Sequence, residues 1–216
     1  MSKLYCISGL GADERVFKNL KIPRCEVLHI HWIQPESNEC ISKYSRRLST
    51  QIDTSEDYFL LGLSFGGLLT LEMLKFLKPV KTFLVSSFKT RKELPFYYRL
   101  AGNLCLHKII PDVMIGNPSF LIWFFNNANS REERELLGNM LKSADVPLTQ
   151  WSIKQILDWK GQTAEGNILH IHGDADRILP LRCIDADFII SGGSHLMIYN
   201  RAPEIGRIIS DIIKGS

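Results

Sequence analysis

Apolar runs that fit buried strands alternate with helical patterns along most of the sequence. The predicted strands, in chain order, cover Leu4–Ser8, Glu26–His31, Tyr58–Leu61, Lys81–Ser86, Asn167–His172 and Ala186–Ile190. Between them apolar residues recur at helical spacing, most clearly in Glu39–Ile52 and in Pro203–Ile213. This alternation predicts an α/β fold, in which about six parallel strands form one sheet with helices on both faces.

The alternation stops in the middle of the chain. Residues 89–160 contain helical fragments, scattered prolines and many aromatic residues, but no convincing strand. We expect this segment to be a helical cap inserted over the carboxyl ends of the strands, where ligands bind in open α/β sheets. A chain of 216 residues can bury one sizeable core, so we expect residues 1–216 to form one domain that includes this cap.

The third predicted strand leads directly into a glycine-rich motif. Residues 62–66 read Gly-Leu-Ser-Phe-Gly, and a largely apolar helical pattern follows and ends at Pro79. A serine is a useful nucleophile where its hydroxyl is held exposed, beside a base and near donors for an oxyanion. A sharp turn between a buried strand and a helix holds Ser64 in this way. The alternative is an ordinary strand–helix turn in which Ser64 is the helix N-cap.

Two later segments offer partners for this serine. Asp174 and Asp176 follow the fifth predicted strand, and His195 follows the sixth. Because the carboxyl ends of parallel strands meet at one edge of a sheet, we expect these side chains near Ser64. A nucleophilic serine needs a histidine base and a carboxylate that orients this base. Considered alone, Asp174 could equally be an aspartate that stabilises a turn. In the same way, His195 could be an ordinary histidine of a loop.

In three segments the sequence resembles the α/β-hydrolase superfamily, in particular small capped serine hydrolases of the carboxylesterase type. These segments are Gly62–Gly67, His172–Pro180 and Gly192–His195, the last followed by Arg201–Glu204. The resemblance implies a catalytic triad with Ser64 as nucleophile, Asp176 as acid and His195 as base. It selects Asp176 over Asp174 because the acid of the family falls three residues after the loop glycine, here Gly173.

The resemblance also implies an oxyanion hole made of two backbone N–H groups. One belongs to Phe65, directly after the nucleophile, and the other to the turn Ser8–Gly11 after the first strand, where we choose Leu10. The family usually has His-Gly in this turn, whereas this chain has Ser-Gly, a change that keeps the backbone donors. Family members often have two further strands before this one, so about six strands are expected here.

The overall composition narrows the functional class. The net charge is +3 without a long basic run, so nothing favours a nucleic acid as partner. Five widely spaced cysteines predict neither a disulfide framework nor a cysteine zinc site. The pairs His29/His31 and His170/His172 could each offer two metal ligands, but no third ligand accompanies them, which favours a structural role. The sequence has no secretory signal and no membrane-length apolar run, which favours a cytoplasmic protein.

Together these features predict a serine hydrolase that cleaves carboxylic esters of small to medium apolar substrates through an acyl-enzyme intermediate. Its partner is then a small-molecule ester, and the reaction needs no metal and no cofactor. We expect aromatic residues of the cap, foremost Phe96, Trp123 and Phe124, to line the substrate pocket. Two alternatives stay open: a thioesterase, amidase or lyase that uses the same triad, or a binding protein with a vestigial site.

Overall fold

In a computed structural model, residues 1–103, 131–161 and 167–215 of the chain are described. Six strands form one sheet in the order β2-β1-β3-β4-β5-β6, and every neighbouring pair is parallel. The strands are β1 (Ser2–Ile7), β2 (Cys25–His29), β3 (Tyr58–Leu63), β4 (Lys81–Val85), β5 (Ile168–Gly173) and β6 (Phe188–Ile190). The predicted parallel sheet is thereby confirmed, and each predicted strand overlaps an observed one.

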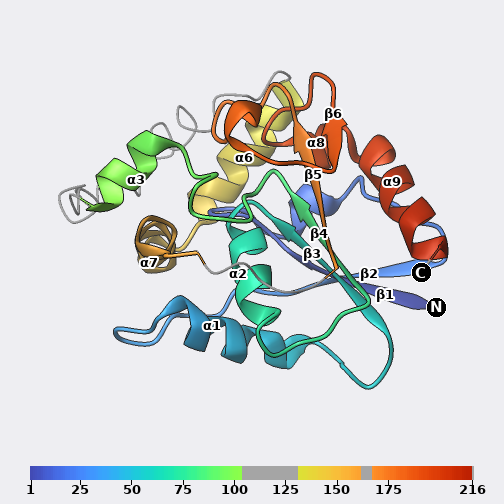
Figure 1. The fold of residues 1–216 in the computed structure, drawn as a ribbon, viewed down its shortest axis with the longest axis horizontal. Coiled ribbons are helices and arrows are strands. Elements are labelled where there is room, and N and C mark those ends of the chain that lie inside the picture. The colour runs from blue at the N-terminus through green and yellow to red at the C-terminus, as the bar shows by residue number, and fades with distance from the viewer. Residues whose placement is uncertain (104–130, 162–166, 216) are drawn as a thin grey trace.

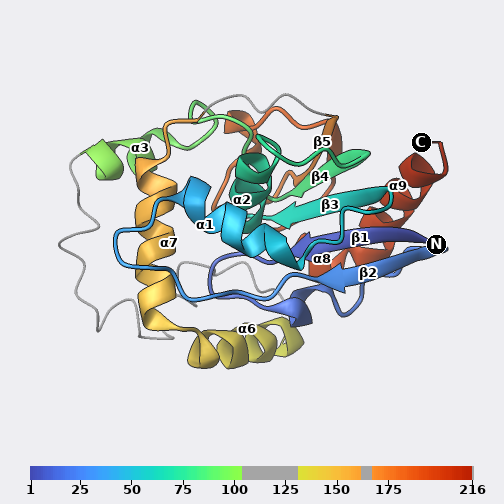
Figure 2. The same ribbon diagram turned by 90° about the horizontal axis from the view of Figure 1, so that it is seen from below.

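Helices cover both faces of this sheet and make three layers (Figures 1 and 2). One face carries α1 (Ile41–Leu48) and α2 (Phe65–Met73). The other face carries the short 3₁₀ helix η1 (Glu14–Phe17) together with α8 (Met197–Asn200) and α9 (Ala202–Lys214). None of the described helices is long and apolar enough to cross a membrane.

Three described helices lie between β4 and β5: α3 (Phe96–Asn103), α6 (Arg131–Ser143) and α7 (Val146–Asp158). They lie beyond the carboxyl ends of the strands (Figure 2). The start of α7 follows from its sequence, because the Asp145 carboxylate accepts a hydrogen bond of 2.8 Å from the Leu148 N–H and Pro147 lies in the first turn. In α6, Glu132 and Glu133 stand in the first turn, where negative charge favours a helix.

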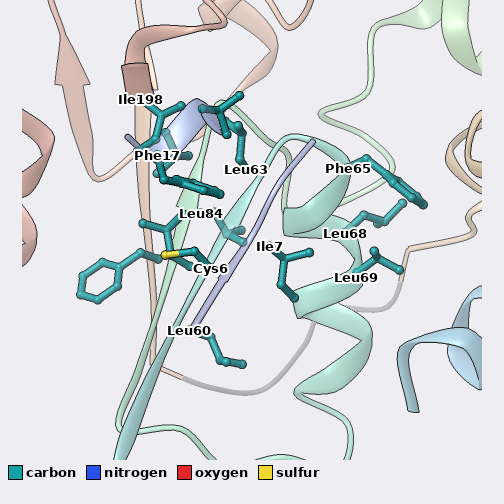
Figure 3. Packing of buried hydrophobic residues seen from close by; sticks show 14 of the residues in the cluster. Cys6, Ile7, Phe17, Leu60, Leu63, Phe65, Leu68, Leu69, Leu84 and Ile198 are labelled. Atoms are coloured by element: carbon teal, nitrogen blue, oxygen red, sulfur yellow. The ribbon is translucent and has the colours of Figure 1, made fainter. Parts of the chain in front are cut away.

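The core follows from the alternation of side chains along the central strands. In the register that pairs Cys6 with Leu61, Cys6 points to one face of the sheet and Ile7 to the other. Figure 3 shows Cys6 on the side of Phe17 and Ile198, while Ile7 lies against α2. Every residue of α2 is buried, and most of them are apolar. The exceptions are Thr70 and Glu72, whose buried side chains are hydrogen-bonded. The site described below is therefore built on a fully buried helix and the central strands.

Candidate active site

Ser64 lies at the sharp turn between β3 and α2. Its backbone has φ 51° and ψ −117°, a conformation that residues with a side chain rarely adopt. Three hydrogen bonds hold it: the Ser64 N–H donates to the Val85 carbonyl at 3.0 Å, and the Ser64 carbonyl accepts from the Gly67 N–H at 2.9 Å and the Ser87 hydroxyl at 2.8 Å. The Ser64 side chain makes no N-cap hydrogen bond. The hydroxyl is thus left for another partner.

Glycines make this turn sterically feasible. A Cβ on Gly66 would collide with the carbonyl oxygens of Ile7 and Ser8, so α2 and β1 approach each other backbone to backbone. A Cβ on Gly62 would lie 2.5 Å from the Cα of Gly67. Both contacts are far shorter than side chains tolerate, so the first turn of α2 reaches the sheet only because these residues are glycine.

The structure brings the three predicted catalytic side chains together. His195 Nε2 lies 3.0 Å from Ser64 Oγ, and His195 Nδ1 lies 2.8 Å from Asp176 Oδ2. The other carboxylate oxygen, Asp176 Oδ1, accepts hydrogen bonds of 2.9 Å from the backbone N–H groups of Ile178 and Leu179. Ser64 follows β3, Asp176 follows β5 and His195 follows β6, so one edge of the sheet supplies all three.

Asp176 is buried, yet its surroundings favour the charged carboxylate. Burial by itself would raise the pKa, but the charge and hydrogen bond of His195, together with the Leu179 N–H, outweigh it. The pKa of Asp176 is therefore held below its ordinary value of 3.8. At neutral pH the site contains an anion whose oxygens are both hydrogen-bonded and which faces Nδ1 of His195.

Asp174, the other carboxylate considered, has a different position. Its Oδ1 accepts a hydrogen bond of 2.6 Å from the Gly192 N–H, and its own N–H donates to the Ile190 carbonyl at 3.2 Å. These bonds join the loop after β5 to the loop after β6. Asp174 thus ties together the two loops that carry Asp176 and His195.

Two further histidines lie behind the acid. His172 Nε2 is 2.8 Å from the Leu179 carbonyl oxygen, which can only accept, so this nitrogen carries the proton; it also lies 3.6 Å from Asp176 Oδ2. The His170 ring packs edge-on against His172 with centroids 5.2 Å apart. Among the described residues its ring nitrogens make only poorly aligned contacts, with the backbone of Ser87 and Asp185. Burial lowers the pKa of both histidines, that of His170 to about 3. Within the described ranges no group of three His, Cys, Asp or Glu side chains is arranged to hold a metal ion.

The turn after β1 lies against the nucleophile. A Cβ added to Gly9 would lie 3.2 Å from Ser64 Cβ, so this loop passes directly over the serine. The backbone N–H groups of Leu10 and Phe65 have no hydrogen-bond acceptor in the described part of the chain. Both remain available to a ligand oxygen, which is what oxyanion donors require.

Side chains that the sequence did not identify hold this turn in shape. The Ser8 hydroxyl donates to the Ala12 carbonyl at 2.8 Å, and the Trp32 indole N–H lies 2.9 Å from both Ser8 Oγ and the Ala12 oxygen. The Ser8 hydroxyl therefore closes the turn from within. No sequence signal marked Trp32, because its role depends on β2 lying next to β1.

A small cavity of about 20 Å³ opens onto the serine. Its lining comes from the turn after β1, the β3–α2 turn, α6 and the loop after β6: Gly9, Leu10, Gly11, Ala12, Leu63, Ser64, Leu137, His195 and Leu196. Leu137 shows that α6 contributes to the cover over the serine. Phe96 does not line this cavity and is 69 % exposed on α3. Trp123 and Phe124 lie outside the described residues.

The similarity of this chain to known proteins is one of fold. No protein-family model matches the sequence, and no curated protein matches it at a significant level. Among solved structures, the chain is similar to MenH from S. aureus, with a TM-score of 0.74 and 14 % identity over 99 % of this chain and 94 % of the other. A thermophilic esterase from Thermogutta terrifontis gives a TM-score of 0.72 and 14 % identity over 100 % of this chain and 90 % of the other. A putative lipase from Acinetobacter baumannii gives 0.72 and 15 %, over 99 % and 84 %.

Proposed function

Since the chain has the α/β-hydrolase fold, we propose that it is a serine hydrolase that cleaves carboxylic esters of small to medium apolar substrates. The observation that carries the proposal is the hydrogen-bonded series Asp176–His195–Ser64, with distances of 2.8 and 3.0 Å. Serine, base and buried acid in this order are the minimum set for nucleophilic attack on an acyl group. On this proposal the described helices α3, α6 and α7 belong to the cap expected for residues 89–160, and α6 contributes Leu137 to the cavity at the serine.

The proposed reaction begins at the serine hydroxyl. His195 Nε2 takes the proton of Ser64 Oγ while this oxygen attacks the ester carbonyl carbon. Asp176 keeps the Nδ1–H tautomer and stabilises the imidazolium that forms. The Leu10 and Phe65 N–H groups receive the developing oxyanion, each contributing about 3–4 kcal/mol to the transition state. His195 then protonates the leaving alcohol, and water releases the acyl group from Ser64 by the same route.

The test is the Ser64→Ala variant, assayed with p-nitrophenyl acetate and p-nitrophenyl butyrate. We expect kcat/KM to fall by at least about 10³-fold while the circular dichroism spectrum stays unchanged, because only the nucleophile is lost. A fluorophosphonate probe should label the wild-type protein and leave Ser64→Ala unlabelled.

Ser191→Ala is the matched control, since Ser191 is an exposed serine at the same edge of the sheet and should leave both readouts unchanged. A folded wild-type protein that neither turns over esters nor reacts with the probe would contradict the proposal and favour a binding protein. Turnover of thioesters or amides in preference to matched esters would keep the triad and change the substrate class.

A further inference from the structure

A second cavity, of about 170 Å³, lies beside the one at the serine. It lies between the turn after β1, Trp32 and the facing ends of α6 and α7, and is partly open to solvent. Its lining comprises Leu10, Gly11, Ala12, Asp13, Trp32, Met140, Ser143, Ala144, Asp145, Leu148, Thr149 and Ser152. An internal volume of about 150 Å³ is enough to bind a benzene molecule, so this cavity can hold one ring or a branched group of similar size.

The two cavities lie side by side. Leu10, Gly11 and Ala12 line both of them. Leu137 of α6 lines the cavity at Ser64, and Met140, one helical turn further on, lines the second. The two cavities therefore adjoin at the turn after β1 and along α6, so a long enough molecule bound at Ser64 would reach the second cavity.

The chemistry of the lining favours an uncharged occupant. The Asp13 carboxylate already accepts from the Arg15 guanidinium at 2.8 and 3.0 Å. The Asp145 carboxylate accepts at 2.8 Å from both the Leu148 N–H and the Gln34 amide. No lysine and no arginine lines the cavity, whereas two carboxylates do. Arg15 also donates to the lining residue Ser143 at 3.2 Å, but its charge is already paired with Asp13. A negatively charged group would thus meet the Asp145 carboxylate and no unpaired counter-ion on the lining.

We infer that this cavity, on the proposed function, receives the acyl arm of the ester, and that this arm is an uncharged group about the size of a six-membered ring. The leaving alcohol must lie within reach of His195, which protonates it. His195 lines the cavity at the serine but not the second one. The second cavity adjoins Leu10, on the oxyanion side, and so accommodates the other arm.

The first test compares p-nitrophenyl esters whose alcohol is constant and whose acyl groups are acetyl, cyclohexanecarbonyl, 4-carboxycyclohexanecarbonyl and dodecanoyl. Each kcat/KM is divided by the rate of spontaneous hydrolysis. The cyclohexane ester should exceed the acetate by at least about tenfold, since an apolar pocket gains about 10–200-fold for a fitting apolar group. The carboxylated ring should fall at least about tenfold below the plain ring, and the dodecanoate should gain nothing over it.

The second test fills the cavity. Ala144→Leu should lower the ratio of cyclohexane ester to acetate by at least about tenfold, because Ala144 lines the second cavity and not the first. Lys142→Leu is the control, as it adds the same side chain at an exposed position two residues earlier and should leave the ratio unchanged.

Failure of this inference differs from failure of the proposed function. Ser64-dependent acetate turnover without a ring preference, or a ratio that Ala144→Leu leaves unchanged, would overturn the acyl cavity and leave the serine hydrolase intact. If no ester is turned over, calorimetric binding of the cyclohexane ester decides: binding that Ala144→Leu weakens at least about tenfold supports the cavity, and binding it leaves unchanged overturns it.

Discussion

Two aspartates in one short loop illustrate how surroundings decide the role of a residue. Asp176 is buried, faces His195 and accepts two backbone N–H groups. Asp174 accepts the Gly192 N–H and joins two loops at their surface. From the loop sequence alone, either aspartate could be the acid of the triad, and only the resemblance to a family selected Asp176. The distances give the physical reason, since a carboxylate orients a histidine only within hydrogen-bond reach.

Replacing each aspartate by asparagine separates these roles. Asp176→Asn should lower kcat by about 10⁴-fold, because an amide donates where the carboxylate accepts and favours the wrong tautomer of His195. Asp174→Asn should change kcat by less than about tenfold, since the amide oxygen can still accept the Gly192 N–H. The measurement is ester turnover at saturating substrate. Equal losses in both variants would argue that Asp176 has no special place in the reaction.

His170 makes the stability of the fold dependent on pH. Its pKa falls from 6.5 to about 3 on burial, so below pH 6.5 the unfolded chain binds a proton that the folded site refuses. The free energy of unfolding should therefore decrease as the pH falls from 6.5 toward 3, by up to about 1.4 kcal/mol per pH unit. The lowered pKa of His172 acts in the same direction.

The variant His170→Phe should flatten this dependence, since phenylalanine cannot bind a proton and the replaced nitrogens make only poorly aligned backbone contacts among the described residues. Urea unfolding at pH 8, 6 and 5 measures the slope for both proteins. The value at pH 8 isolates the packing difference, and only the change between pH 8 and 5 reports on the proton. An unaltered slope would show that another group dominates.

At the scale of elements, the β3–α2 turn is tightly constrained. It holds Ser64 at positive φ and brings α2 into backbone contact with β1 through Gly66. A strained conformation persists only where the surrounding bonds over-determine it. The Val85 and Ser87 hydrogen bonds supply that constraint here.

Gly66→Ala tests the backbone approach. The new methyl group would collide with the carbonyl oxygens of Ile7 and Ser8, so β1 and α2 must move apart at a cost of about 1–3 kcal/mol or more. Gly215→Ala is the control, because its Cβ would lie 3.7 Å from the nearest atom, an ordinary contact, and its effect should stay within about 0.5 kcal/mol. Thermal unfolding measures both. An unchanged melting temperature for Gly66→Ala would show that this approach can relax freely.

The elements differ in how well the sequence predicted them. The strands could be predicted because a strand buried on both faces leaves an apolar run between turn residues. Between β4 and β5 the sequence pattern indicated only fragments of helices. Which face of such a helix meets the site depends on its docking, so neither the contribution of Leu137 nor the exposure of Phe96 could be derived from the pattern. Leu137 lies on α6, whose many charged residues obscure its apolar face in the sequence.

At the scale of the whole molecule, the sheet order brings distant segments into one site. Ser64 and His195 are separated by 131 residues, yet β3, β4, β5 and β6 stand side by side. Periodicity along the chain gives no neighbours between strands, so the order of the strands could not be predicted from it. That the groups at strand ends meet at one edge could be predicted, because all parallel strands end on the same side.

The edge position of β6 makes the site sensitive to partial opening. β6 has three residues and lies at the end of the sheet, and His195 stands in the loop that follows it. In rising urea we expect esterase activity to be lost at a lower concentration than far-UV circular dichroism, because edge elements open at a smaller free-energy cost than the core. Coincident midpoints would instead show that the edge unfolds together with the whole sheet.

The order of the site residues along the chain also determines when each of them is synthesised. The ribosome delivers Ser64 first, and at roughly 5–20 residues per second the 131 residues up to His195 take roughly 7–26 s more. Throughout that interval the nascent chain carries a serine without its base, and for most of it also without Asp176. On the proposed function, such a chain cannot hydrolyse esters until β6 has joined the sheet and brought His195 to Ser64. Catalytic activity therefore appears only when folding is complete.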